Sequence, residues 1–69
     1  MALTVPHSER LLLRVEEAAA VVGLSRAMLY ELVRVGAIRS VKVGRATRIP
    51  RAALEEWVQR LESEAGADA

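Results

Sequence analysis

The chain of 69 residues contains no cysteine and no phenylalanine, and it has one tryptophan, one tyrosine and one histidine. Without cysteine it can form neither a disulfide nor a thiolate metal site. With so few aromatic side chains, its core must be built from Leu, Val, Ile and Ala, which favours packed helices over an aromatic-rich sandwich. A chain of this length forms one small domain, which buries only about 60% of the surface that the unfolded chain exposes.

Long apolar runs are also missing. The longest run near the N-terminus is Leu11 to Leu13, whereas a transmembrane helix needs roughly 20 apolar residues and a signal peptide needs an apolar core of its own. We therefore expect no membrane span and no signal peptide, and a protein that works in the cytoplasm.

No cluster of residues suggests catalysis or metal binding. His7 stands without a partner near the N-terminus. The pairs Glu16-Glu17 and Glu55-Glu56 are neighbours in sequence, and adjacent helical residues point about 100° apart, so these carboxylates do not converge on a substrate. The glycines form no phosphate-binding loop. The sequence predicts no enzyme, no bound metal and no cofactor.

Charge, by contrast, is distributed very unevenly. Residues 26–51 hold seven Lys and Arg against a single Glu, whereas the rest of the chain holds three Arg against eight acids. The basic segment therefore carries +6 and the remainder −5, which sum to the net charge of +1. Clustered cations release counterions when they neutralise phosphates, so this segment predicts binding to nucleic acid. The alternative is a solvated basic surface.

Apolar periodicity predicts two helices in the first half of the chain. A short strand over 11–13 leads into a helix over 15–22, where two glutamates suit the positive end of the helix dipole. Gly23 interrupts this pattern, and Ser25 is a good N-cap for a second helix from Arg26 to about Val35. Gly36 then provides a stop signal.

A change of period predicts a β-hairpin and then a third helix. Val41, Val43 and Ile49 alternate with polar residues around a tip over 44–46, and Pro50 closes the hairpin. The last helix is expected from 51 to about 62, with Leu54, Trp57 and Leu61 in the core and its glutamates facing away. The predicted fold class is mainly α with a small β-hairpin. The chain is expected to consist of a flexible arm over 1–10, a domain over 11–62 and a flexible tail over 63–69.

The first two predicted helices have the pattern of a helix-turn-helix. Ala19 is small enough to let the helices approach closely, and Gly23 lies in the turn. The shared core is expected from Leu24, Leu29 and Leu32. The alternative is an ordinary helical hairpin in a small bundle. The register of small residue, glycine, apolar residue and cap favours DNA binding.

The runs EEAAAVVGLSRAMLYELVRVGAI (16–38), KVGRATRIP (42–50) and ALEEWV (53–58) resemble the excisionase-type DNA-binding domains, which have a MerR-like winged helix-turn-helix fold. The resemblance covers residues 11–61 and implies three helices with a two-stranded wing. Arg14 departs from the family, where Thr or Ser caps the first helix. Because Arg cannot accept an amide hydrogen bond, we expect a loss of about 1 kcal/mol at this cap.

The second helix is expected to enter the major groove of DNA. Arg26 suits a guanine edge, Tyr30 a phosphate, and Arg34 a phosphate more than a base. Glu31 is better placed to pair with Arg34 than to read cytosine. For Ser25, capping the helix competes with a contact to a phosphate. Ala27 suits a thymine methyl group. The predicted contacts on this helix are Ser25, Arg26, Ala27, Tyr30 and Arg34.

The resemblance implies a second contact through the hairpin, with a minor groove or its phosphates. The residues that match this role are Lys42, Arg45, Thr47 and Arg48. For Arg48 the alternative is a salt bridge to an acid of the last helix.

What the resemblance implies is an excisionase, a recombination directionality factor. Such proteins bind repeated sites on double-stranded DNA near an attachment site, commonly as side-by-side copies, bend the DNA and assist a phage or plasmid integrase. Two alternatives remain open. One is a small MerR-like transcriptional regulator with the same fold, and the other is a protein-interaction module that uses the acidic last helix and binds no nucleic acid.

Overall fold

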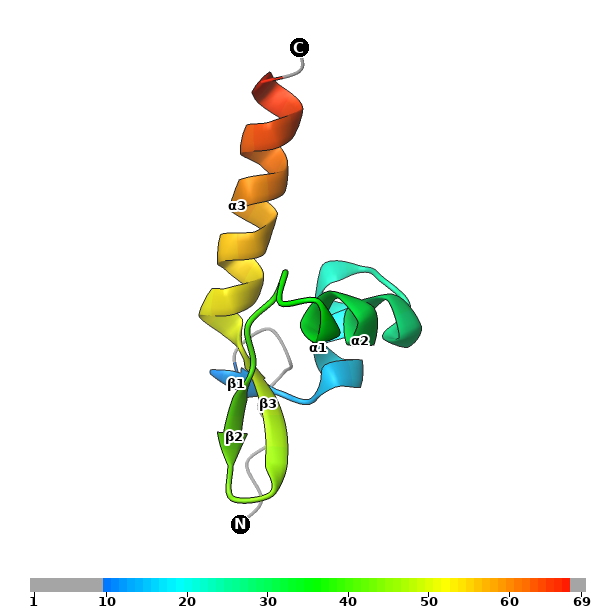
Figure 1. Ribbon diagram of the computed structural model, residues 1–69, viewed down its shortest axis with the longest axis vertical. Helices are drawn as coiled ribbons and strands as arrows, with labels where there is room; N and C mark the ends of the chain where they lie inside the picture. Colours follow the sequence, from blue (N-terminus) through cyan, green and yellow to red (C-terminus); the bar gives the residue numbers. More distant parts are fainter. Residues whose placement is uncertain (1–9, 68–69) are drawn as a thin grey trace.

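The computed structural model describes residues 10–67. Almost all of the predicted arm, including His7, and the last two residues of the predicted tail lie outside the described residues. The element order is β1 (Leu12–Leu13), α1 (Val15–Val22), α2 (Arg26–Arg34), β2 (Val41–Val43), β3 (Ala46–Pro50) and α3 (Arg51–Ala67). This is the mainly helical winged helix-turn-helix that the sequence predicts, with α1 and α2 beside the sheet and α3 running away from it (Figure 1).

The small sheet has the strand order β1-β3-β2, and all of its pairings are antiparallel. The predicted hairpin pairs Val43 with Ala46, so the loop is Gly44–Arg45 and the predicted tip residue Ala46 belongs to β3. The predicted strand near residue 12 adds a third member, because Leu13 pairs with Ile49 and the Arg51 N–H donates to the Leu11 carbonyl at 2.8 Å. The wing is therefore tied to the start of α1.

The core lies where α1, α2, β3 and the start of α3 meet. Leu13, Leu29 and Ile49 are completely buried, and Ile38, which follows α2, is 1% exposed. Half-buried Val22, Leu32, Val33 and Trp57 pack against this cluster. The aliphatic core predicted from the composition is confirmed, and Ile38 is a core residue that the periodicity of the helices did not indicate.

The turn between α1 and α2 follows the expected pattern. Gly23 has φ +78°, and its N–H donates to the Ala20 carbonyl while the Leu24 N–H donates to the Ala19 carbonyl, so two of the last carbonyls of α1 have partners. Ala19 is 3% exposed and belongs to the core. The turn fixes the direction in which α2 leaves the domain.

The third helix differs from its predicted length. It continues to Ala67, beyond the predicted end at Glu62, and its outer half extends away from the rest of the domain (Figure 1). The prediction that Leu61 lies in the core is wrong, because this side chain is 45% exposed. Leu54 and Trp57 do pack inward as predicted. The apolar stripe of α3 therefore extends beyond the part of the helix that packs against the rest of the domain.

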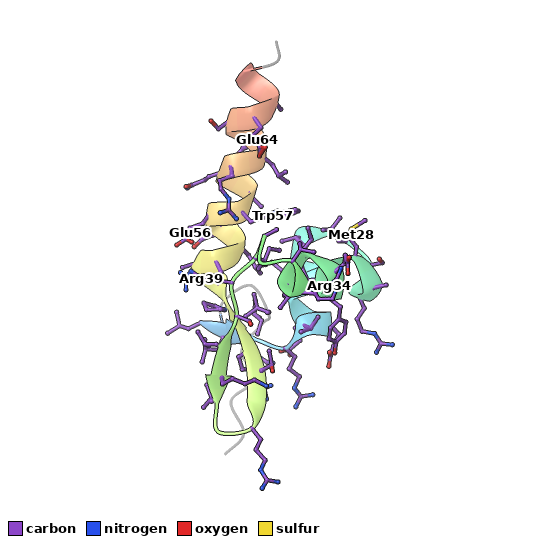
Figure 2. The ribbon with its side chains drawn as sticks, in the orientation of Figure 1. Met28, Arg34, Arg39, Glu56, Trp57 and Glu64 are labelled. Carbon is purple, nitrogen blue, oxygen red and sulfur yellow. The ribbon has the colours of Figure 1, made fainter. Side chains whose placement is uncertain are left out.

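The segment between α2 and β2 is held against α3 from two directions. Arg39 pairs with Glu56 at 3.1 Å (Figure 2). Arg60 donates to the Ala37 carbonyl. These contacts anchor the chain on both sides of buried Ile38. They give the path from the second helix to the hairpin a defined course.

Candidate nucleic-acid interface

The second helix presents a polar face from its first turn onward. The Ser25 hydroxyl accepts from the Met28 N–H at 3.1 Å, which confirms the predicted N-cap. Leu29 is buried beneath the helix, and Leu32 and Val33 are half-buried on the same side. The opposite side is open to solvent. Every residue predicted to contact DNA from this helix is exposed, namely Ser25, Arg26, Ala27, Tyr30 and Arg34.

The hairpin presents the second set of predicted contacts. Lys42 and Arg45 are exposed, and Lys42 lies directly opposite Thr47 in the β2–β3 ladder. Thr47 and Arg48 are half-buried, and the Arg48 Nη1 donates to the Thr47 carbonyl at 2.9 Å. Gly44, with φ +63°, takes the first position of the two-residue loop and places Arg45 at the end of the hairpin.

A hollow of about 460 Å³ joins these two surfaces. Tyr30 and Arg34 line it from α2, and Thr47 and Arg48 line it from β3. The structure therefore brings together residues that are far apart in the sequence and that were predicted separately for the helix and the wing. The remaining predicted residues lie outside the hollow, at the start of α2 and along the outer part of the hairpin: Ser25, Arg26, Ala27, Lys42 and Arg45.

Two arginines of the basic segment are engaged in ion pairs. Arg34 donates twice to Glu31, at 2.6 and 2.7 Å, which confirms the predicted pair. The hydrogen bond lowers the pKa of Glu31 and raises that of Arg34. The predicted alternative for Arg48, a salt bridge to the last helix, is wrong: within residues 10–67 the arginine that pairs with α3 is Arg39 (Figure 2).

The start of α1 forms a third wall of the hollow, which sequence reasoning missed. Arg14 and Glu16 line it beside the residues of α2 and β3. Arg14 is exposed, and its side chain makes no capping hydrogen bond, as predicted; its N–H donates instead to Glu17 at 2.9 Å. No local pattern could have placed Arg14 here, because its position follows from the pairing of β1 with β3.

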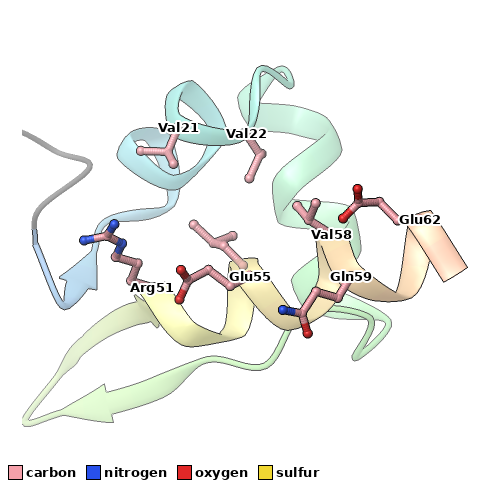
Figure 3. A pocket seen from close by; sticks show the side chains of 8 residues that line it. Val21, Val22, Arg51, Glu55, Val58, Gln59 and Glu62 are labelled. Carbon is pink, nitrogen blue, oxygen red and sulfur yellow. The ribbon is translucent and has the colours of Figure 1, made fainter.

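A second hollow, of about 530 Å³, lies between α1 and α3 (Figure 3). Val21, Val22 and Val58 supply apolar lining, while Glu55 and Glu62 bring carboxylates to it. Among the described residues of the lining, these two carboxylates outnumber the one cation, Arg51, and carboxylates repel phosphates, so this hollow suits a nucleic acid poorly. The basic hollow beside the hairpin is the better candidate interface.

Metal-ligand residues do not gather in the described part of the chain, where no group of three His, Cys, Asp or Glu could hold a metal ion. Between residues 10 and 67, no helix is both long enough and apolar enough to cross a lipid bilayer. The candidate interface is thus a surface of arginines, hydroxyls and a lysine.

Comparison with known proteins agrees with this geometry. A family model described as a helix-turn-helix domain matches residues 12–62. A protein of Saccharopolyspora erythraea named as a probable excisionase is 52% identical over 52 residues, which cover 75% of this chain and 53% of that protein. The chain thus spans about half the length of this relative. No solved structure matches at a significant level. The chain therefore belongs to the helix-turn-helix domain family.

Proposed function

We propose that this protein binds double-stranded DNA sequence-specifically, with α2 in the major groove and the β2–β3 hairpin at the neighbouring minor groove. The observation that carries the proposal is the basic hollow in which Tyr30 and Arg34 of α2 meet Thr47 and Arg48 of β3. A helix and a hairpin on either side of one hollow suit two adjacent grooves of one duplex. The exposed start of α2 offers Arg26 to a base edge.

The role proposed for this binding is excision. The protein would bind repeated sites beside a recombination attachment site, bend the DNA and direct a phage or plasmid integrase toward excision, without a catalytic step of its own. A relative named as a probable excisionase supports this role. Bending a site of 20–30 base pairs costs about 1–6 kcal/mol, which side-by-side copies on adjacent sites could offset.

Footprinting combined with a bending assay on the DNA that flanks the gene tests the proposal. We expect clustered protected sites and a bend centred on them, and loss of excision in a deletion strain that still makes the integrase. A single isolated site on straight DNA would contradict the excision role. Footprints over promoters together with unchanged excision would instead favour the small transcriptional regulator.

A further inference from the structure

One arginine side chain that lines the hollow between α2 and the hairpin neither caps a helix nor belongs to the predicted DNA contacts. Arg14 lies on its α1 wall. Leu13 and Ile49 are cross-strand partners, and both are fully buried. Because the pairing is antiparallel, the residues next in register are Arg14 and Arg48. The sheet therefore brings these two arginines to the same rim of the hollow.

Folding gives the Arg14 side chain little to do. A guanidinium has no acceptor atom, so it cannot satisfy the free N–H groups at the start of α1. Glu17 supplies the other half of that cap, since its carboxylate accepts from the Arg14 N–H. Threonine at this position would stabilise the helix better. An arginine here weakens the cap and places a positive charge on the rim.

The path of a bound duplex passes over this hollow. If α2 lies in the major groove and the hairpin lies at the adjacent minor groove, the sugar–phosphate strand that separates the two grooves must run between them. The hollow is the space between these elements, and Arg14, Arg34 and Arg48 all line it. Guanidinium groups bind phosphates through paired hydrogen bonds.

We infer that Arg14 binds a backbone phosphate of the strand between the two grooves and, with Arg48, fixes how far the wing lies from the recognition helix. This inference rests on the proposed DNA binding. Glu16 lies on the same wall and opposes the contact. Arginines outnumber it there, and the carboxylate is held at the N-terminal turn of α1, where the helix dipole favours it.

The substitution Arg14→Thr separates binding from folding. It restores a capping hydroxyl, so we expect the urea midpoint to stay at or above that of the wild type. Losing one phosphate contact should weaken DNA binding roughly fivefold to tenfold near 0.1 M salt and reduce the slope of log K against log salt by about 0.9. Arg14→Lys, which keeps the charge, should retain most of that slope.

Arg51→Thr is the matched control, because it removes the same charge at the start of α3, where Arg51 lines the hollow between α1 and α3 and not the one beside the hairpin. Its affinity and salt slope should follow the wild type. If Arg14→Thr behaves like this control, the inference is overturned while DNA binding stands. If the wild type itself binds duplex DNA without salt dependence, the proposed function and the inference both fall.

A methylphosphonate scan of the footprint locates the contact. Replacing one phosphate at a time by a neutral methylphosphonate should weaken wild-type binding most between the major groove that α2 occupies and the adjacent minor groove. At that phosphate, Arg14→Thr should lose little further affinity, because its partner is already gone. Additive losses at every phosphate would overturn the assignment.

Discussion

Ser25 serves the fold and faces the proposed duplex at once. Its hydroxyl accepts from the Met28 N–H, and it stands before the first turn of the recognition helix. We expect Ser25→Ala to lower the free energy of unfolding by about 0.5–2 kcal/mol, measured by urea denaturation. Ser25→Asp keeps the cap but adds a negative charge, so it should leave stability near the wild-type value and weaken DNA binding. Equal stability of the Ser25→Ala variant and the wild type would contradict the cap.

Glu31 holds the Arg34 guanidinium through two hydrogen bonds on the exposed face of α2. A phosphate must compete with this carboxylate for the arginine. We expect Glu31→Gln to tighten DNA binding a few-fold at low salt, since it frees Arg34 and removes a like charge from the interface. Glu64→Gln, far along α3, is the control and should change affinity little. Weaker binding of the Glu31→Gln variant to its specific site would show that Glu31 reads a base instead.

At the scale of elements, the wing depends on its two-residue loop. Gly44 has φ +63°, a conformation that costs residues with a Cβ about 1–2 kcal/mol. We expect Gly44→Ala to distort the hairpin and to weaken DNA binding. The thermal midpoint should fall little, because the buried core lies away from the loop. Gly66→Ala is the matched control in α3, where the added methyl group meets nothing, and it should not affect binding. Unchanged affinity of the Gly44→Ala variant would contradict a role for the wing.

The Arg39–Glu56 pair makes the tie between the α2–β2 segment and α3 sensitive to pH. The hydrogen bond from Arg39, and then its charge, lower the pKa of Glu56. Since the folded pKa lies below the unfolded value of about 4.3, the pair stabilises the fold above that pH. This stability is lost as the pH falls through the folded pKa.

Thermal midpoints measured from about pH 6 to about pH 3 test this tie. The wild type should lose more stability over that range than Glu56→Gln, by a small margin because the pair is exposed. Glu55→Gln, one position earlier on α3, should follow the wild-type curve. Parallel curves for the wild type and Glu56→Gln would contradict a stabilising pair.

The elements differ in how well the sequence predicts them, for identifiable physical reasons. The end of α1 follows from a local signal, because Gly23 adopts the left-handed conformation that ends the helix. The length of α3 was underestimated, since its outer half has no apolar partner to pack against, and alanine and glutamate favour a helix without one. Helical spacing predicts which side of α3 faces the core, but not how far along α3 the rest of the domain reaches. For this reason the prediction for Leu61, which is 45% exposed, is wrong.

The candidate site was predictable in its parts but not in its assembly. Helical spacing identified the exposed side of α2, and alternation identified the hairpin. The hollow that unites them depends on the pairing of β1 with β3, which is a tertiary contact. Arg14 and buried Ile38 were missed for this reason, since their surroundings come from distant segments.

Over the whole molecule, most of the positive and most of the negative charges lie on different elements. Most arginines of residues 26–51 lie on α2 and the hairpin; the exceptions are Arg39, which pairs with α3, and Arg51, the first residue of α3. The exposed glutamates of α3 extend away from the hairpin, with Glu64 near the far end of the helix (Figure 2). A duplex held by α2 and the wing would therefore stay clear of most of the negative charge.

The salt dependence of duplex binding tests most directly the central claim that two elements hold one duplex. The wild type should lose affinity steeply and linearly on a plot of log K against log salt. The Arg45→Ala, Arg48→Ala double variant should bind more weakly with a slope reduced by about 2, while its fold is intact by circular dichroism. A flat plot for the wild type, or the same affinity and slope for the double variant, would contradict the claim.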